Sequence, residues 1–510
     1  MKLMHYQEFL RKTYTFLSGV TMLLFLFCCN NIVDEPPPTA VIELHSGGSH
    51  QLTASSSNVQ WGSDNPTVAT VSATGLVTAV GVGKAAIFTY SSGSEQHIVC
   101  YVEVYPKRNI LFYIATDNNQ LDNGSEGDEP RTAINAIRAG WTPGRGEMLI
   151  YTDQTRRRPC LMRIAETQNA DGLYDIDTIM VYEEENSASA LVLSRVINTV
   201  VRDYPEESYG MIFFSHASGW LPEGMLSNPR SSLVDDSNAN HAPIMADISS
   251  DKPRSLVIDR GDGTSREMKY EDFAAAIPDK QFDFIIFEAC FMADVMTMYE
   301  LRNKSEYVLA SSAEIVSPGY TPLYRDHIMQ LYDTKNPVPT VVSEFAKIFI
   351  NYITSSYSET HVRCSSTLGL IKTSEMGNLA TTVRATLNGI KLDETTLSVD
   401  NIQRFDRPNK LIGSGQRKNR YFDFGHAMEN LVPASQLAAF RTQMGKTVVW
   451  KANTKRFLLS NNGNTPYYAE YDGFFIEHHS GLSTYIEQSA YPILNSAYKN
   501  SSWYKAIYTN

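Results

Sequence analysis

The sequence predicts an α/β fold with a mainly parallel sheet and helices on both faces, preceded by a small all-β module. Three observations lead to this prediction. Short uninterrupted apolar runs at 109–116, 211–214 and 282–287 are typical of strands buried on both faces of a parallel sheet. Segments with helical periodicity, such as 188–202, alternate with these runs. Before them, residues 39–105 contain short strand-like pieces and turns with almost no helical period.

The N-terminus has the pattern of a secretory signal. A basic start precedes an apolar stretch from Phe16 to Phe27, which is shorter than the roughly 20 residues that span a bilayer. Its end is similar to a bacterial lipoprotein signal, which implies a signal peptide over residues 1–28 and lipidation of Cys29. A plain signal peptide with incidental cysteines is the alternative. The acidic and proline-rich residues 29–38 then predict an extended tether.

These features predict a location in the bacterial cell envelope. The chain would be lipid-anchored and either periplasmic or surface-exposed, with membrane contact through the N-terminal lipid only. A net charge of −12, without any run rich in Lys and Arg to offset it, argues against nucleic acid as a partner. The length of 510 residues predicts two or three domains.

Four cysteines follow the signal region, and they are too scattered for a disulfide scaffold. One pair stays open as an alternative. No Cys-x-x-Cys or His-x-x-x-His spacing indicates zinc, so the sequence requires no cofactor and assigns no metal ligand. The four cysteines are Cys100, Cys160, Cys290 and Cys364.

Residues 39–105 are expected to form a β-sandwich, because turn signals separate the strand-like pieces at the spacing typical of such folds. The stretch from Trp61 to Gly83 closely resembles bacterial Ig-like domains of group 2. That resemblance implies a spacer, with an adhesive unit as the alternative. The expected strands are 40–44, 59–61, 68–71, 75–79, 85–90 and 98–104.

Residues 106–510 are expected to form the α/β part, with Pro106 at its boundary. The pattern predicts further elements, although it does not give the order of the late strands. The additional strands are 148–151, 307–311, 367–371 and 484–486, and the additional helices include 272–277 and 293–302.

Two of the apolar strands end in chemically reactive residues. The run at 211–214 leads to His216, and the run at 282–287 leads to Cys290. In open α/β sheets ligands bind where such strands end, so the two side chains could share one site. Each residue alone has a plain structural explanation, since a free cysteine often acts as a small buried hydrophobe. Both flanks follow the same pattern, however, and this favours a cysteine hydrolase.

The segments around these residues resemble the clostripain family of cysteine peptidases, family C11 of clan CD. The resemblance rests on Ser215 to Trp220, on Phe287 to Met292, and on the 74-residue spacing between His216 and Cys290. Weaker similarity at 310–314, 318–320 and 480–485 extends it from about Asn109 to the C-terminus. It implies a caspase-like α/β sandwich, with a core at about 106–345 and a C-terminal subdomain, and cysteine endopeptidase activity on protein or peptide substrates.

The resemblance also implies roles for individual residues. Cys290 would be the nucleophile, His216 would protonate the leaving amine, and the backbone N–H groups of Ala217 and Cys290 would bind the oxyanion. A helix that begins just beyond Cys290 would favour the thiolate through its dipole. The family usually has glycine where this chain has Ala217, and Gly219 could supply the missing freedom at positive φ.

Besides Ala217, the chain departs from the family pattern at a residue expected to determine substrate preference. The family typically carries Asp two residues before the cysteine and cleaves after Arg or Lys, whereas this chain has Glu288 there. A glutamate carboxylate can still bind a guanidinium bidentately. Glu288 is therefore the expected substrate-binding residue, and Glu314 is a candidate for a second acid.

The stretch from Leu221 to Lys269 is rich in prolines and polar residues, which predict loops. Because family members often cut themselves here, self-processing after Arg230, Arg254 or Arg260 is expected, with an ordinary surface insertion as the alternative. Asp259 to Gly263 resembles a fragment of a calcium loop without the full ligand series, so calcium stays open as a cofactor.

Two other functions compete with the endopeptidase. One is a weak or inactive pseudo-peptidase that acts as a surface binding or adhesion lipoprotein. The other is a different Cys–His acyl-transfer enzyme, such as an amidase or a transpeptidase.

Overall fold

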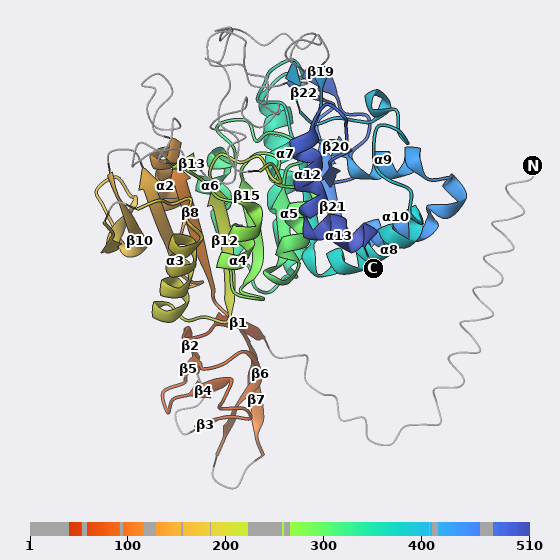
Figure 1. Ribbon diagram of the computed structural model, residues 1–510. Coiled ribbons are helices and arrows are strands. Elements are labelled where there is room, and N and C mark those ends of the chain that lie inside the picture. The colour runs from red at the N-terminus through yellow and green to blue at the C-terminus, as the bar shows by residue number, and fades with distance from the viewer. Residues whose placement is uncertain are drawn as a thin grey trace, which may run out of the picture. The chain divides into compact units, whose positions relative to one another are not determined.

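A computed structural model (Figure 1) describes residues 40–53, 59–91, 95–116, 129–154, 157–183, 185–222, 258–259, 266–406, 409–410, 417–458 and 473–509. The expected signal at 1–28, the tether at 29–38 and Cys29 lie outside these residues. The chain divides into two compact units, Met1–Val104 and Tyr105–Asn510.

The first unit contains two antiparallel sheets. The strands of the larger sheet follow the order β1-β7-β6-β3, and those of the smaller one follow β2-β5-β4. Apolar side chains from both sheets, including Val77, Ile87 and Val102, form one buried cluster between them. The predicted β-sandwich is therefore confirmed. Its strands are β1 (Val41–His45), β2 (Ser49–Gln51), β3 (Gln60–Ser63), β4 (Ala69–Val71), β5 (Leu76–Ala79), β6 (Gly83–Tyr90) and β7 (His97–Tyr105).

The second unit is built on a nine-stranded sheet. Its five central strands run parallel, as predicted, whereas the two outer strands on each side are antiparallel to their neighbours. In sheet order the strands are β11 (Tyr174–Val181), β10 (Arg157–Gln168), β9 (Met148–Gln154), β8 (Arg108–Thr116), β12 (Ser208–Phe214), β15 (Phe282–Glu288), β16 (Ser305–Ala310), β17 (Thr367–Lys372) and β21 (Val448–Asn453).

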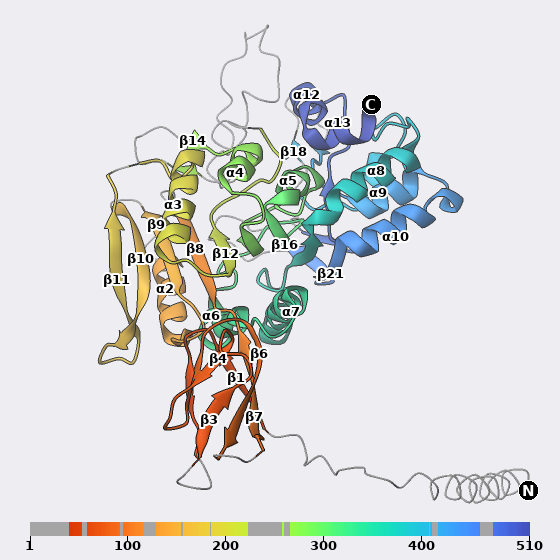
Figure 2. The ribbon, with the colours of Figure 1, turned by 90° about the horizontal axis from the view of Figure 1, so that it is seen from below.

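Helices cover both faces of this sheet, because the strand side chains alternate between two buried cores. Phe112 of β8 packs on the side of α2 (Glu129–Gly140), α6 (Thr321–His327) and α7 (Val338–Ser356). Its neighbour Tyr113 packs in the core that contains α3 (Ala190–Asp203), α4 (Tyr270–Ala276) and α5 (Val295–Glu300). Figure 2 shows the two helical layers with the sheet between them.

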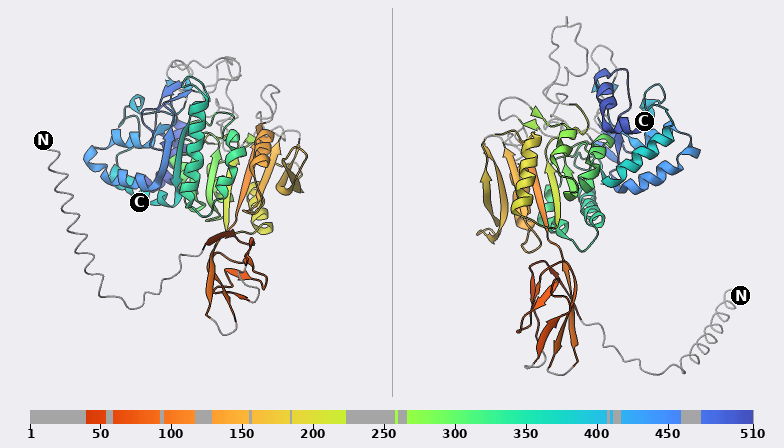
Figure 3. Two further views of the ribbon diagram at one scale, coloured as in Figure 1. Left: turned by 180° about the vertical axis from the view of Figure 1, so that it is seen from behind. Right: turned by 60° about the horizontal axis from the view of Figure 1, so that its bottom comes forward.

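The residues after 345 complete the central sheet, since they supply β17 and β21. The same part of the chain adds a group of helices beside that end of the sheet (Figure 3). The strand expected at 484–486 lies elsewhere: β24 (Ser483–Thr484) pairs with β20 (Phe422–Asp423) outside the main sheet. The late helices are α8 (Met376–Leu387), α9 (Phe424–Leu431), α10 (Ala438–Thr447), α12 (Pro492–Asn500) and α13 (Ser502–Tyr508).

Three short antiparallel pairs complete the described strands. They are β13 (Ile258–Asp259) with β14 (Arg266–Glu267), β18 (Asn409–Lys410) with β19 (Arg417–Lys418), and β22 (Arg456–Leu458) with β23 (Gly473–Phe475). Within the described ranges, every helix is too short or too polar to cross a membrane.

Candidate active site

The pairing of β12 with β15 brings His216 and Cys290 to the same edge of the sheet. The two strands are parallel neighbours, and Phe214 pairs with Glu288. Each of these residues lies two positions before a predicted catalytic residue, so His216 and Cys290 leave the sheet at the same level. Neighbouring strands lie about 4.8 Å apart, so the loops that carry the two residues start from adjacent positions. Both residues are half-buried.

The thiol of Cys290 contacts the loop that follows β16. The backbone N–H of Ile315 donates to Sγ at 3.3 Å, and Sγ lies 3.9 Å from the Ile315 carbonyl oxygen. A hydrogen bond donated to sulfur favours the thiolate over the thiol. Ile315 was not identified from the sequence, because it lies 25 residues beyond Cys290 and carries an unremarkable aliphatic side chain.

The helix predicted at 293–302 is present as α5, which begins at Val295, five residues beyond Cys290. It spans six residues and has Asp294 as its N-cap, which accepts from the Thr297 N–H at 2.9 Å. Phe291, directly after Cys290, has a left-handed φ of 59° and turns the chain between the thiol and the helix.

The loop after His216 approaches the loop after Cys290 at a glycine. Gly219 has a φ of +56°, and a Cβ atom there would overlap the Phe291 carbonyl oxygen and lie 2.5 Å from Asp294 Oδ2. Ala217 is buried, and its φ is not positive. The left-handed position of this loop is thus Gly219, so alanine at 217 carries no backbone strain.

Asp294 is fully buried at this contact between the two loops. Burial raises the pKa of its carboxyl group to about 7, against the opposing effect of hydrogen bonds from Thr297 and nearby backbone groups. The carboxyl group thus changes charge near neutral pH at the point where the loops meet.

Glu288 is only 4% exposed, and its carboxyl group is hydrogen-bonded inside the protein. It accepts from the Tyr320 N–H at 2.6 Å and from the Tyr324 hydroxyl. Burial raises the pKa of Glu288 to about 8, so the group is mostly neutral at pH 7 in this state. Its neighbour in space is Gly319, where a Cβ atom would overlap Glu288 Oε1. Glu314 is also buried and directly precedes Ile315, whose backbone contacts the thiol.

Late segments of the chain close around this site. The Ser483 N–H donates to the Ala293 carbonyl oxygen at 2.8 Å, which places the late motif 480–485 against the loop after Cys290. Tyr421 contacts both catalytic loops. Its hydroxyl donates to the Ser218 carbonyl oxygen, and its ring stacks on Phe291 with centroids 4.4 Å apart. No sequence pattern singles out Tyr421, because it is one of 28 tyrosines and lies 203 residues beyond Ser218.

Four of the expected features lie outside the residues that the structure describes. These are Arg230, Arg254, Arg260 and most of the calcium-like fragment at 259–263. Within the described part, no group of three or more His, Cys, Asp or Glu residues could hold a metal ion. The cysteines of that part form no disulfide with one another; they are Cys100, Cys160, Cys290 and Cys364.

A sequence model of the clostripain family matches residues 113–507. The chain belongs to this family of cysteine proteases. A second model, for the bacterial Ig-like domain of group 2, matches residues 46–99. No curated protein matches the chain significantly.

Solved structures similar to this clostripain-family chain are C11 proteases. One is an inactive zymogen from Parabacteroides distasonis, with 25% identity, a TM-score of 0.59, and coverage of 79% of this chain and 99% of that one. Another is a secreted protease from Bacteroides thetaiotaomicron in complex with an irreversible peptide inhibitor, with 24% identity and the same TM-score and coverage. These likenesses confirm the predicted fold of the α/β unit.

We predict that Gly219→Ala lowers kcat/KM at least tenfold and destabilises the protein by about 1–3 kcal/mol, because alanine would be forced to a left-handed φ and into the Phe291 carbonyl group. The matched control is Ala217→Gly, which should change kcat/KM by less than about threefold, since glycine needs no new space. Peptide hydrolysis and the urea unfolding midpoint measure both effects. Equal behaviour of the two variants would contradict this account of the loop.

Proposed function

We propose that this protein is a cysteine endopeptidase whose His216 and Cys290 form the catalytic dyad, and that it cleaves after Arg or Lys. The observation that carries the proposal is the shared register of β12 and β15, which brings an imidazole and a thiol to one edge of the sheet. Membership of the clostripain family supports the same chemistry.

The residues divide the reaction into two steps. The Cys290 thiolate attacks the scissile carbonyl carbon, and the C–N bond breaks as His216 donates a proton to the leaving amine. A water molecule, deprotonated by His216, then attacks the thioester, which releases the carboxylic acid product and restores the thiol. The backbone N–H groups of Ala217 and Cys290 are the proposed donors to the oxyanion in both steps.

Two buried acidic side chains support a preference for Arg or Lys. Glu288 lies two residues before the nucleophile, and Glu314 adjoins the residue that contacts the thiol. Glu288 is mostly neutral without substrate, but a nearby guanidinium would favour its charged form and lower its pKa. The substrate would thereby generate the charge that binds it.

We expect peptides with Arg or Lys before the scissile bond to be hydrolysed by the wild-type protein, with turnover reduced at least about 10³-fold in Cys290→Ala. His216→Ala should lose a comparable factor, because the leaving amine would depart unprotonated. A fluorogenic peptide panel with Arg, Lys, Gln and Leu at that position is the measurement, made with and without calcium. If the wild-type protein hydrolyses no peptide, before or after limited proteolysis, the result would favour the pseudo-peptidase that acts as a surface-binding lipoprotein. Turnover of cell-wall fragments alone would favour the amidase or transpeptidase.

The acid that recognises the substrate is tested in the same panel with Glu288→Gln and Glu314→Gln. Replacement of the glutamate that binds the basic side chain should lower, at least about tenfold, the ratio of kcat/KM for Arg peptides to kcat/KM for Gln peptides. The variant of the other glutamate serves as the matched control, because each substitution removes one buried carboxyl group. If both variants keep the wild-type ratio, neither Glu288 nor Glu314 forms the pocket.

We also propose self-processing between His216 and Cys290. The similar structure of the Parabacteroides distasonis protease is described as an inactive zymogen, which supports maturation by cleavage. Intact mass and N-terminal sequencing of stored wild-type protein should reveal a new N-terminus after Arg230, Arg254 or Arg260. Cys290→Ala should remain one chain under the same conditions. If the active enzyme stays uncut, self-processing is excluded and the segment is an ordinary surface insertion.

The proposed location is the cell envelope, with a lipid on Cys29. Expression of Cys29→Ser in a bacterial host should move the protein from the membrane fraction to the soluble fraction, because the thiol that carries the lipid is gone. Cys28→Ser is the matched control and should leave the protein in the membrane fraction. Membrane retention of Cys29→Ser would exclude this anchor.

A further inference from the structure

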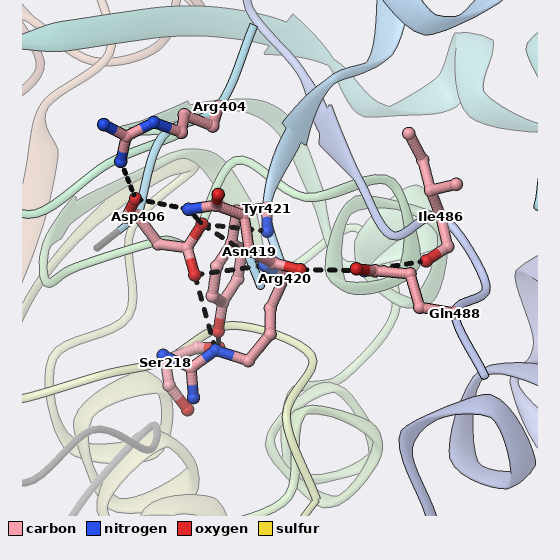
Figure 4. A network of polar contacts seen from close by, with 8 residues as sticks. All are labelled: Ser218, Arg404, Asp406, Asn419, Arg420, Tyr421, Ile486 and Gln488. Carbon is pink, nitrogen blue, oxygen red and sulfur yellow. Dashed lines mark hydrogen bonds and ion pairs between the residues drawn. The ribbon is translucent and has the colours of Figure 1, made fainter. Parts of the chain in front are cut away.

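We propose that Tyr421 is a positioning residue for the oxyanion-binding loop, held in place by the buried carboxylate of Asp406. The inference rests on the proposed function, since it assigns a role within the same site. It starts from the bond between the Tyr421 hydroxyl and the Ser218 carbonyl oxygen, which Figure 4 shows together with the surrounding network.

The bond completes a pair of anchors around the reactive part of the loop. On one side, Ser215 Oγ donates to the Ala115 carbonyl oxygen of β8 at 2.8 Å. On the other side, Tyr421 holds the Ser218 carbonyl group. His216 and Ala217 lie between these two anchors, so their backbone orientation depends on both.

The second anchor is needed because of Gly219. Glycine adopts φ values of either sign at little cost, so the peptide plane between Ser218 and Gly219 could rotate easily. The carbonyl oxygen of that plane belongs to Ser218, which is fully buried, and it accepts from the Tyr421 hydroxyl and, at 3.4 Å, from the Leu221 N–H of the same loop. The bond from Leu221 is local, so Tyr421 supplies the contact that ties this plane to a distant part of the chain.

Tyr421 also contacts the second catalytic loop. Its ring stacks on Phe291, the residue directly after Cys290, with centroids 4.4 Å apart and planes 22° apart. Tyr421 is 1% exposed. One side chain thus touches the residue two positions after His216 and the residue one position after Cys290, and it fixes the spacing between the two proposed oxyanion donors.

Asp406 fixes the backbone that carries Tyr421. Its carboxylate, which is 0% exposed, accepts from the N–H groups of Tyr421 at 3.3 Å and Arg420 at 3.1 Å, and from Asn419 Nδ2 at 3.0 Å. Arg420 Nε lies 3.4 Å away and supplies the opposite charge. A buried carboxylate persists only with such partners, so the network keeps residues 419–421 in one conformation (Figure 4). Gln488 adds a bond to the Asn419 carbonyl oxygen at 2.8 Å.

Tyr421→Phe tests the role, because it removes the hydroxyl and keeps the stacked ring. We expect kcat on the best peptide to fall about 10- to 100-fold with KM changed less than about twofold, which is below the roughly 10²–10³-fold loss for removal of an oxyanion donor. Alkylation of Cys290 by iodoacetamide forms no oxyanion, so its rate should stay within about twofold of wild type. A general loss of stability or of thiol reactivity would lower both rates, whereas misplacement of the loop groups that act on the scissile bond lowers kcat alone.

Tyr332→Phe is the matched control. Tyr332 is 0% exposed, and its hydroxyl donates to the Glu147 carbonyl oxygen at 3.1 Å, just before β9 and so at the opposite end of the parallel strands from both loops. It should lose one buried hydrogen bond and keep the wild-type kcat. Asp406→Asn provides a second variant, which should lower kcat with the same selectivity over alkylation, because it weakens the support of Tyr421.

The outcomes are separable. A Tyr421→Phe variant that matches wild type in kcat overturns the inference, and so does one in which kcat and alkylation fall together with the unfolding midpoint. If the wild-type protein hydrolyses no peptide while Cys290 still reacts with iodoacetamide, the proposed function itself fails and the inference falls with it.

Discussion

The parallel pairing of β12 with β15 is the constraint on which the rest of the active site depends. The backbone ladder sets Phe214 against Glu288, and this single register places the two catalytic loops side by side at the carboxyl edge of the sheet. A slip by one residue would turn every side chain of a strand to the opposite face and separate the loops. Close packing opposes such a slip, because the side chains of each strand are fitted to different neighbours in the two cores.

The register alone does not shape the loops. Their shape comes from contacts with segments far along the chain, which include Ile315 at the thiol, Ser483 at the loop after Cys290, and Tyr421 between both loops. The part of the chain after residue 345 therefore does two things. It supplies the last two strands of the sheet, and it packs against the loops that carry the chemistry. The predicted C-terminal part thus shares the central sheet with the predicted core.

Burial also decides the charge state of the site. Glu288 and Asp294 both have raised pKa values because they lie inside the protein, and both remain hydrogen-bonded there. The protonation state of a carboxyl group whose pKa lies near 7 changes readily when a positive charge arrives, because the ionised form then gains a partner. In the proposed function, the packing that fixes the geometry of the loops would thereby also make their charge respond to a bound substrate.

The sequence by itself predicted the β-sandwich, the parallel central strands and the clostripain family, which are confirmed, because buried strands and short motifs leave local patterns. The same patterns selected His216 and Cys290 as the proposed dyad. The sequence also marked Gly219 as a position of unusual freedom. Only the tertiary structure decided the antiparallel outer strands, the late start of α5, the inward position of the Glu288 carboxyl group and the role of Tyr421. The physical reason is the same in each case. These features depend on contacts between residues that are distant in the chain, and no local spacing or periodicity records such contacts.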